Sequence, residues 1–413
     1  MTTIGAVGTY LPPWGTERAR SAGPDEDAVT LGVAAARAAI HRSGPDTVRR
    51  VVFVTRDLPL LEGGNGAALL AGIGLEARVP VVEQVGGAPA ALDAVVDAGP
   101  GTLVVAVDLA PAGAGAVLLG DPTGHAGPEV APAGRVVRSM PVRVRAADGI
   151  VRDYDDPRLQ RERGLGVAVE RLGLPAKPAV VAGLPARQAA ALCAGRAPIL
   201  PTTGASATVF AIAALAEVGS PALVLAVEQG SATAVTVAGV PAVRRDERSP
   251  TPLPAVTANP GPEIAISLAA YERAFEPKLR WEAGRCDACG ALAFPPRYRC
   301  LQCGSEAGWS LTPLPRRGEV YTVTTVHVPV PGLPTPYSLA IVELDGVDVR
   351  ALVKVTGVPA GTAGIGNRGS LVLRRVAVRS GIPDYGYALL PDPPVTGETA
   401  PAALAALAEG ALR

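Results

Sequence analysis

The amino-acid sequence predicts a layered α/β domain that is followed by a four-cysteine ribbon and a small all-β barrel. Three observations support this prediction. Apolar strands alternate with helical patterns over residues 1–240. Four of the five cysteines then fall between residues 286 and 303. Beyond them, short stretches of β-branched residues are separated by Gly and Pro turns, which is typical of a small β-barrel.

The first half of the α/β domain covers residues 1–122. Its strands are apolar along their whole length, which indicates a sheet that is covered on both faces. We expect strands at Thr3–Tyr10, Val51–Thr55, Val79–Val85, Thr102–Leu109 and Ala114–Leu119, and helices at Asp25–His41, Gly66–Ile73 and Ala88–Ala98.

The second half covers residues 166–240. Before it, residues 123–165 are more polar, and their charged run at 153–163 predicts a solvated, partly helical excursion. Residues 241–261 are rich in proline and charge, so we place a linker there. In the second half we expect helices at Gly166–Leu172, Ala186–Cys193 and Ala207–Glu217, and strands at Ala179–Ala182, Ala222–Glu228 and Ala232–Ala238.

The cysteines form two CxxC pairs, Cys286 with Cys289 and Cys300 with Cys303. Each pair can turn two thiolates toward one point, and two pairs together suit a tetrahedral Zn²⁺ site. Four sulfur ligands leave no position for water or substrate, so we predict a structural zinc. Two disulfides are the alternative. The N-terminal residues lack the pattern of a secretory signal, which favours free thiols in a reducing, cytoplasmic setting.

The region from residue 262 to 392 resembles the DUF35 family, which joins a rubredoxin-like zinc ribbon to an OB-fold and is associated with acyl-CoA enzymes. The resemblance depends on the cysteine spacing, the Phe294–Arg297 insert between the two pairs, and the order of strands that follows. It implies a helix and ribbon at 262–310, an OB-fold at 311–392 and an acyl-CoA thioester as ligand. We expect the helix at Glu263–Phe275, barrel strands at Gly318–Thr322, Tyr337–Glu343, Ala351–Val355 and Ser370–Val378, and a Pro/Ala-rich tail at 393–413 with a helix at Pro401–Leu412.

The first 240 residues resemble the thiolase fold, in the branch of HMG-CoA synthase and ketoacyl synthase III. The opening IGAVGTYLP, the two α/β halves and the fused ribbon and barrel indicate this. The resemblance implies a nucleophilic cysteine at a helix N-terminus, where the helix dipole and backbone N–H groups lower its pKa. It also implies a histidine, an asparagine or a glutamate that handles the protons.

The positions that should carry this chemistry lack the required side chains. The cysteine position falls at Gly86 or Gly87, the histidine position near Gly183, and the asparagine position near Pro201. Only the acidic position keeps a candidate, Asp57. The resemblance still places a substrate-binding surface at Gly86, Gly87, Gly183, Thr202 and Thr203.

Two functions remain open. The first is an accessory, scaffold or CoA-binding subunit of a C–C bond-forming acyltransferase complex in specialised metabolism. It would pair with an active thiolase-fold subunit, whereas a homodimer alone would favour the second function, and in either case the chain would meet acyl-CoA or an acyl carrier protein. The second is an enzyme in its own right that performs acyl transfer or aldol and retro-aldol chemistry on a thioester. Its catalytic candidates are Asp57 and Tyr337, with Glu83 as a further acid.

Other functions are disfavoured by composition. The formal net charge is zero, 18% of residues are charged and 4% are aromatic, so a nucleic-acid site on the barrel is not expected. No apolar run approaches the length of a membrane span, so we expect no membrane association. Structural or surface positions are expected for the remaining histidines and the fifth cysteine, which are His41, His125, His327 and Cys193.

Overall fold

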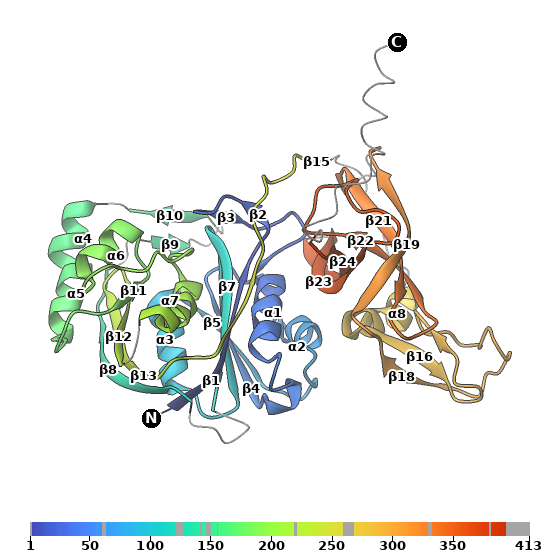
Figure 1. The fold of residues 1–413 in the computed structure, drawn as a ribbon, viewed down its shortest axis with the longest axis horizontal. Helices are drawn as coiled ribbons and strands as arrows, with labels where there is room; N and C mark the ends of the chain where they lie inside the picture. Colours follow the sequence, from blue (N-terminus) through green and yellow to red (C-terminus); the bar gives the residue numbers. More distant parts are fainter. Residues whose placement is uncertain are drawn as a thin grey trace, which may run out of the picture.

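The computed structural model describes residues 2–59, 63–120, 127–140, 143–145, 150–154, 156–218, 221–258, 268–328, 333–379 and 381–393. An α/β domain and a ribbon–barrel domain lie side by side, and helices α1 (Ala28–Ala39) and α2 (Gly66–Ile73) stand between them (Figure 1). The predicted order of a layered α/β domain, a ribbon and an all-β barrel is confirmed. His125 and the helix predicted at Pro401–Leu412 lie outside the described residues.

The α/β domain consists of two halves that repeat one strand pattern. In each half a strand runs parallel to the first arm of an antiparallel hairpin, and another strand runs antiparallel to the second arm. The first half contains β4 (Arg50–Thr55), β6 (Thr102–Leu109), β7 (Ala112–Leu119) and β1 (Thr2–Leu11), with β5 (Val81–Val85) beyond β4 at the edge. The second half contains β11 (Val180–Ala182), β12 (Ala222–Glu228), β13 (Ser231–Ala238) and β8 (Glu129–Val137).

Helices form three layers around these halves. Helices α3 (Ala88–Asp97) and α7 (Ala205–Val218) pack between the two halves in one apolar core. Helices α1 and α2 cover the outer face of the first half, and α5 (Leu165–Leu172) and α6 (Ala186–Leu192) cover that of the second. Because helices lie on both faces, β4, β6, β7 and β12 are buried on both sides, which explains why they are largely apolar, whereas β5 and β8 are partly exposed.

Two strands of the large sheet occur where the sequence indicates none. Residues 129–137, within the predicted polar excursion, form β8, which pairs with β13 and β1 and so joins the halves. Pro132 and Gly134 obscure the strand pattern because both residues are rare inside strands. The sheet accommodates them at a register shift in this ladder. Val243–Glu247, within the predicted linker, forms β14 and pairs in parallel with β1. The sheet therefore continues past the boundary predicted at residue 240.

The second domain begins with α8 (Leu268–Arg280) and the three ribbon strands, and it ends in a closed barrel. The Trp281 ring lies 4.8 Å from that of Phe294 in the ribbon and 5.0 Å from that of Tyr387 in the barrel, so it ties the two parts together. The ribbon strands are β16 (Glu282–Cys286), β17 (Leu292–Ala293) and β18 (Trp309–Pro313); the barrel strands are β19 (Arg317–Val326), β21 (Tyr337–Leu344), β22 (Arg350–Val355), β23 (Arg368–Arg379) and β24 (Ile382–Pro391).

The remaining elements are short and lie at the periphery of this framework. They are β2 (Trp14–Gly15), β3 (Arg20–Ser21), the 3-10 turn Pro45–Thr47, β9 (Arg143–Arg145), β10 (Val151–Asp153), α4 (Pro157–Arg163), β15 (Thr257–Ala258) and β20 (Pro334–Thr335). None of the helices in the described ranges combines the length and the apolar character that a membrane span requires.

The two domains share one continuous hydrophobic core, which runs from α1 and α2 into the barrel. Buried polar contacts cross the same boundary. The Arg374 guanidinium on β23 lies 3.1 Å from the Glu26 carboxylate and donates to the Tyr10 hydroxyl at 3.2 Å. Tyr385 on β24 donates to Asp27, the N-cap of α1, at 2.8 Å. Charged groups buried this deeply need a fixed partner, so the two domains are held in one arrangement.

Candidate functional site

The four ribbon cysteines converge on one point. Their Sγ atoms all lie within 4.8 Å of one another, with Cys286 3.8 Å from Cys303 and Cys289 3.6 Å from Cys300. Tetrahedral zinc with Zn–S bonds of about 2.3 Å requires sulfurs about 3.8 Å apart. The donor set and its spacing therefore fit a structural zinc, which these four thiolates would hold with no open position.

Each CxxC pair is closed by a glycine that directly follows it. Gly290 and Gly304 have φ of +76° and +71°, in the left-handed region. Their N–H groups donate to the carbonyls of Cys286 and Cys300 at 2.8 and 3.0 Å. This turn aims both thiols of a pair at the metal, and a side chain would strain it.

The thiols themselves differ in acidity. Backbone N–H groups of Cys303 and Gln302 lower the pKa of Cys300 to about 6, which favours the thiolate that a metal needs. For Cys289, the backbone N–H of Ala291 lowers the pKa, but hydrogen bonds with the other thiols outweigh it and raise the pKa to about 12.

The elbow between β5 and α3, where the resemblance places a nucleophile, is filled by an ion pair. Gly87 is the N-cap of α3 and has no side chain. Arg56, which follows β4, forms an ion pair with Glu228, the last residue of β12. A Cβ at Gly87 would overlap the carboxylate of Glu228 and the guanidinium of Arg56. Burial lowers the pKa of Arg56, which nearby carboxylates oppose.

The position predicted for the histidine is equally closed. Gly183 follows β11 with φ +94°, and a Cβ there would overlap the carbonyl oxygen of Val227. The same Cβ would lie 3.1 Å from that of Ala88, the first residue of α3. The structure therefore brings Gly86, Gly87 and Gly183 together around the start of α3, as the resemblance implies, but the Arg56–Glu228 pair and the Val227 carbonyl lie where the Cβ atoms of Gly87 and Gly183 would be.

A buried polar cluster at the start of α7 is not indicated by the sequence patterns. Asp108, at the end of β6, accepts hydrogen bonds from the N–H groups of Ala205 and Ser206 at 2.9 and 3.0 Å and from the Ser206 hydroxyl at 2.6 Å. Thr202 extends the cluster through a 2.8 Å contact with Ser206. Burial raises the pKa of Asp108, which these hydrogen bonds oppose. The cluster anchors the positive end of α7.

The three acid–base candidates lie in separate places. Asp57 lies 3.7 Å from Arg145 and accepts from the Leu109 N–H at 3.3 Å. Glu83 accepts from the Asn65 side-chain amide at 2.8 Å and from its backbone N–H, so it fastens β5 to the start of α2. Tyr337 lies in the barrel domain, with the Lys354 ammonium 5.1 Å from its ring centre.

A cavity of about 480 Å³ opens at the elbow, and Gly86, Gly87 and Glu228 line it. Asp57, Gly183, Thr202, Thr203 and Tyr337 are not among its lining residues. Cys193 ends α6 as its C-cap, buried, and burial raises the pKa of its thiol. His41 and His327 are exposed just beyond the ends of α1 and β19.

Comparison with known proteins identifies the family of the second domain. Residues 276–307 match the family model of the ChsH2 rubredoxin-like zinc ribbon domain, and residues 311–374 match that of the ChsH2 C-terminal OB-fold domain. A DUF35 domain-containing scaffold protein of Methanocaldococcus jannaschii is 31% identical over 111 residues, which are 26% of this chain and 78% of that protein. The chain belongs to the DUF35 family.

Two further similarities are to a thiolase subunit and to a synthase structure. The benzoylsuccinyl-CoA thiolase subunit BbsA of Thauera aromatica is 33% identical over 75 residues, which are 18% of this chain; the chain spans about half, 51%, of that subunit. The crystal structure of 3-oxoacyl-[acyl-carrier-protein] synthase III from Aquifex aeolicus is similar at 16% identity, over 58% of this chain and 100% of that one, with a TM-score of 0.45. At this level the likeness carries no argument about activity.

Proposed function

We propose that the protein is a non-catalytic accessory subunit of a C–C bond-forming acyltransferase complex that acts on acyl-CoA thioesters in specialised metabolism. The observation that carries the proposal is the elbow. A nucleophile there would need a side chain at Gly86 or Gly87; neither residue has one, and the Arg56–Glu228 ion pair lies where the Cβ of Gly87 would be. The Glu228 carboxylate also faces the N-terminal end of α3, where an oxyanion would otherwise be stabilised.

The proposed partner is a second thiolase-fold subunit that retains its cysteine and histidine. Its docking surface on this chain is β5. This strand ends the sheet, and within the described ranges it pairs only with β4. Val82 and Val85 on it are 37% and 70% exposed. An apolar edge strand with free backbone groups is a template for another strand, so we expect the partner's own edge strand to pair with it.

A pull-down of the tagged full-length chain from its native cell extract tests this proposal, with mass spectrometry and native mass determination as readouts. We expect a hetero-oligomer with a thiolase-fold chain that carries an intact cysteine and histidine. Val85→Arg should abolish the recovery of that chain, because it places a charge on the pairing edge. Ile199→Arg, at a position 82% exposed outside the sheet, is the matched control and should leave it unchanged.

Recovery of a homodimer alone would contradict the accessory role. The chain would then have to act by itself on acyl-CoA, as an acyl-transfer or aldol-type enzyme without a cysteine. Recovery of the partner by Val85→Arg as well as by the unmodified chain would contradict β5 as the docking surface.

A further inference from the structure

A cleft of about 860 Å³ lies between the two domains, away from the elbow and the ribbon. Helix α1 and strand β14 line it on the α/β side, and β19 and β23 line it on the barrel side. Its apolar lining comes from Val33 and Ile40 of the first domain and from Leu371 and Leu373 of the second. The volume is within the range of small-molecule sites, about 300–1,000 Å³.

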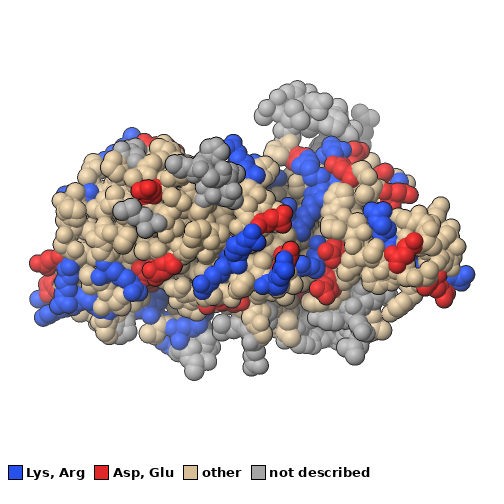
Figure 2. Space-filling view, turned by 90° about the horizontal axis from the view of Figure 1, so that it is seen from below, with Lys and Arg blue, Asp and Glu red and all other residues tan. Residues whose placement is uncertain are grey.

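Arginines concentrate in this cleft. The chain as a whole has a formal net charge of zero, so the concentration is local. Figure 2 shows rows of blue Lys and Arg side chains, with red acidic ones beside them, across the middle of one face where the two domains meet. Among the described residues that line the cleft, Asp246 is the one carboxylate, and the arginines are Arg37, Arg244, Arg245, Arg248, Arg316, Arg317 and Arg374.

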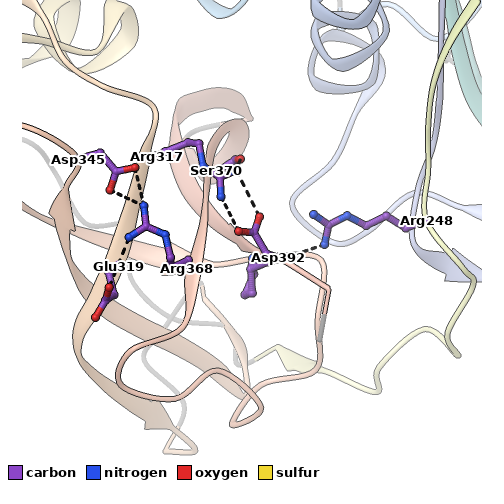
Figure 3. A network of polar contacts seen from close by, with 8 residues as sticks. Arg248, Arg317, Glu319, Asp345, Arg368, Ser370 and Asp392 are labelled. Carbon is purple, nitrogen blue, oxygen red and sulfur yellow. Dashed lines mark hydrogen bonds and ion pairs between the residues drawn. The ribbon is translucent and has the colours of Figure 1, made fainter. Parts of the chain in front are cut away.

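Three of these arginines are neutralised by carboxylates. Arg374 pairs with Glu26 and Arg245 with Glu217 and Glu247. Arg317 is held by Asp392 at 2.5 Å and by Ser370 (Figure 3).

The other four arginines have no carboxylate within ion-pair distance in the described part of the chain. Arg248 extends across the domain boundary to the Pro391 carbonyl at 2.8 Å (Figure 3). Arg316 donates to the Ala71 and Gly72 carbonyls at 3.1 and 2.8 Å, and Arg37 donates to the latter at 3.3 Å. Arg244 is exposed on β14. A carbonyl carries only a partial negative charge, so these contacts offset the guanidinium charges in part and the cleft keeps a positive potential.

One aromatic residue, Tyr387, borders the cleft; its ring is buried, with the Arg316 guanidinium 4.9 Å from the ring centre and the Trp281 ring 5.0 Å away. Asp246 offsets part of the charge; burial raises the pKa of its carboxyl, and the nearby Arg248, Arg374 and Arg244 oppose this shift. The planar donors of arginine match phosphate oxygens in pairs, and the apolar lining suits a hydrophobic or heterocyclic body beside them.

We propose that this interdomain cleft binds an organic phosphate, a ligand in which two or more phosphate groups are joined to an apolar or heterocyclic body. Both domains contribute arginines, so the ligand would also hold the two domains together. A free nucleotide and the phosphorylated end of coenzyme A share this chemistry. The inference depends on the cleft alone and does not require the accessory function proposed above.

Isothermal titration calorimetry of the full-length, zinc-loaded chain tests it, with inorganic pyrophosphate, ADP and coenzyme A as probes. We expect ADP or coenzyme A to bind more tightly than pyrophosphate, because they also fill the apolar part. The affinity should fall as salt rises, because the attraction is between charges. Tighter binding of coenzyme A than of ADP would identify coenzyme A as the ligand of the cleft, and equal binding would identify a free nucleotide as the ligand.

The test variant and its control replace exposed arginines, so we expect both variants to fold as the unmodified chain does. Arg37→Gln combined with Arg244→Gln should weaken binding at least about tenfold, which corresponds to about 1.4 kcal/mol. Arg187→Gln, an exposed arginine on α6 outside the cleft, should leave it unchanged. The proposal is overturned if no probe binds the unmodified chain at about 1 mM, or if the double variant binds as the unmodified chain does.

Discussion

At the scale of the residue, Gly87 decides what the α/β domain can do. The helix that follows it is capped by no side chain, and the space that a nucleophile would need holds an ion pair instead. The absence of a cysteine at the elbow could be read from the sequence. The sequence does not show that Arg56 and Glu228 fill the space. Arg56 follows β4 and Glu228 ends β12, more than 170 residues further along the chain, and only the folded sheet brings them together.

Gly87→Cys should therefore not create an acylated enzyme. Its Cβ would displace the ends of the Arg56 and Glu228 side chains, so we expect a loss of no more than about 1 kcal/mol in the free energy of unfolding, the contribution of a solvent-accessible ion pair. Gly99→Ala, at a position with no atom near its Cβ, is the control and should change little. Denaturant titration and intact-mass spectrometry after exposure to an acyl-CoA measure both effects. An acyl adduct on the cysteine would contradict the interpretation of the elbow.

At the scale of the element, the ribbon is the part that the sequence predicts most completely. Its four ligands, their spacing and the turn glycines follow from local pattern, because each CxxC pair closes within five residues. Strands β8 and β14 were harder to predict because their residues do not look like strand residues. β8 carries Pro132 and Gly134, and β14 reads VRRDE at the margin of the sheet. Each is a strand because a neighbouring strand offers it backbone partners.

The arginine cleft was missed for a related reason. Its arginines come from α1, β14, β19 and β23 and from the residues beside them, and in the sequence each looks like an ordinary surface charge. Sequence patterns report neighbours along the chain. They do not report which charges meet across a domain boundary.

The ribbon also gives a direct prediction. Replacement of any one of Cys286, Cys289, Cys300 and Cys303 by Ser should release the zinc and unfold the ribbon, because metal binding supplies about 10–16 kcal/mol to such a small fold. Cys193→Ser is the control, since its thiol lies far along the chain in another core. Zinc analysis and thermal melting report the outcome. Retained zinc with unchanged melting would be incompatible with a four-sulfur site.

At the scale of the whole molecule, the two domains behave as one unit because a charged network is buried between them. Removal of one partner from a buried ion pair typically costs about 3–5 kcal/mol, since the other charge remains without compensation. Glu26→Gln should therefore destabilise the protein strongly by leaving Arg374 without its carboxylate. Tyr385→Phe removes one hydrogen bond to the buried Asp27 carboxylate at the same boundary and should cost less, about 1.5–3 kcal/mol. Chemical denaturation compares them, and equal losses would show that the Glu26–Arg374 pair does not hold the domains together.

The central claim is that this chain does no chemistry on thioesters by itself. The most direct test measures the release of free coenzyme A from a panel of acyl-CoA thioesters by the purified, zinc-loaded chain alone, with Asp57→Ala as the comparison. We predict no release above the spontaneous rate, and the same result for the variant. Turnover by the unmodified chain that disappears in Asp57→Ala would contradict the account and would establish the protein as an enzyme.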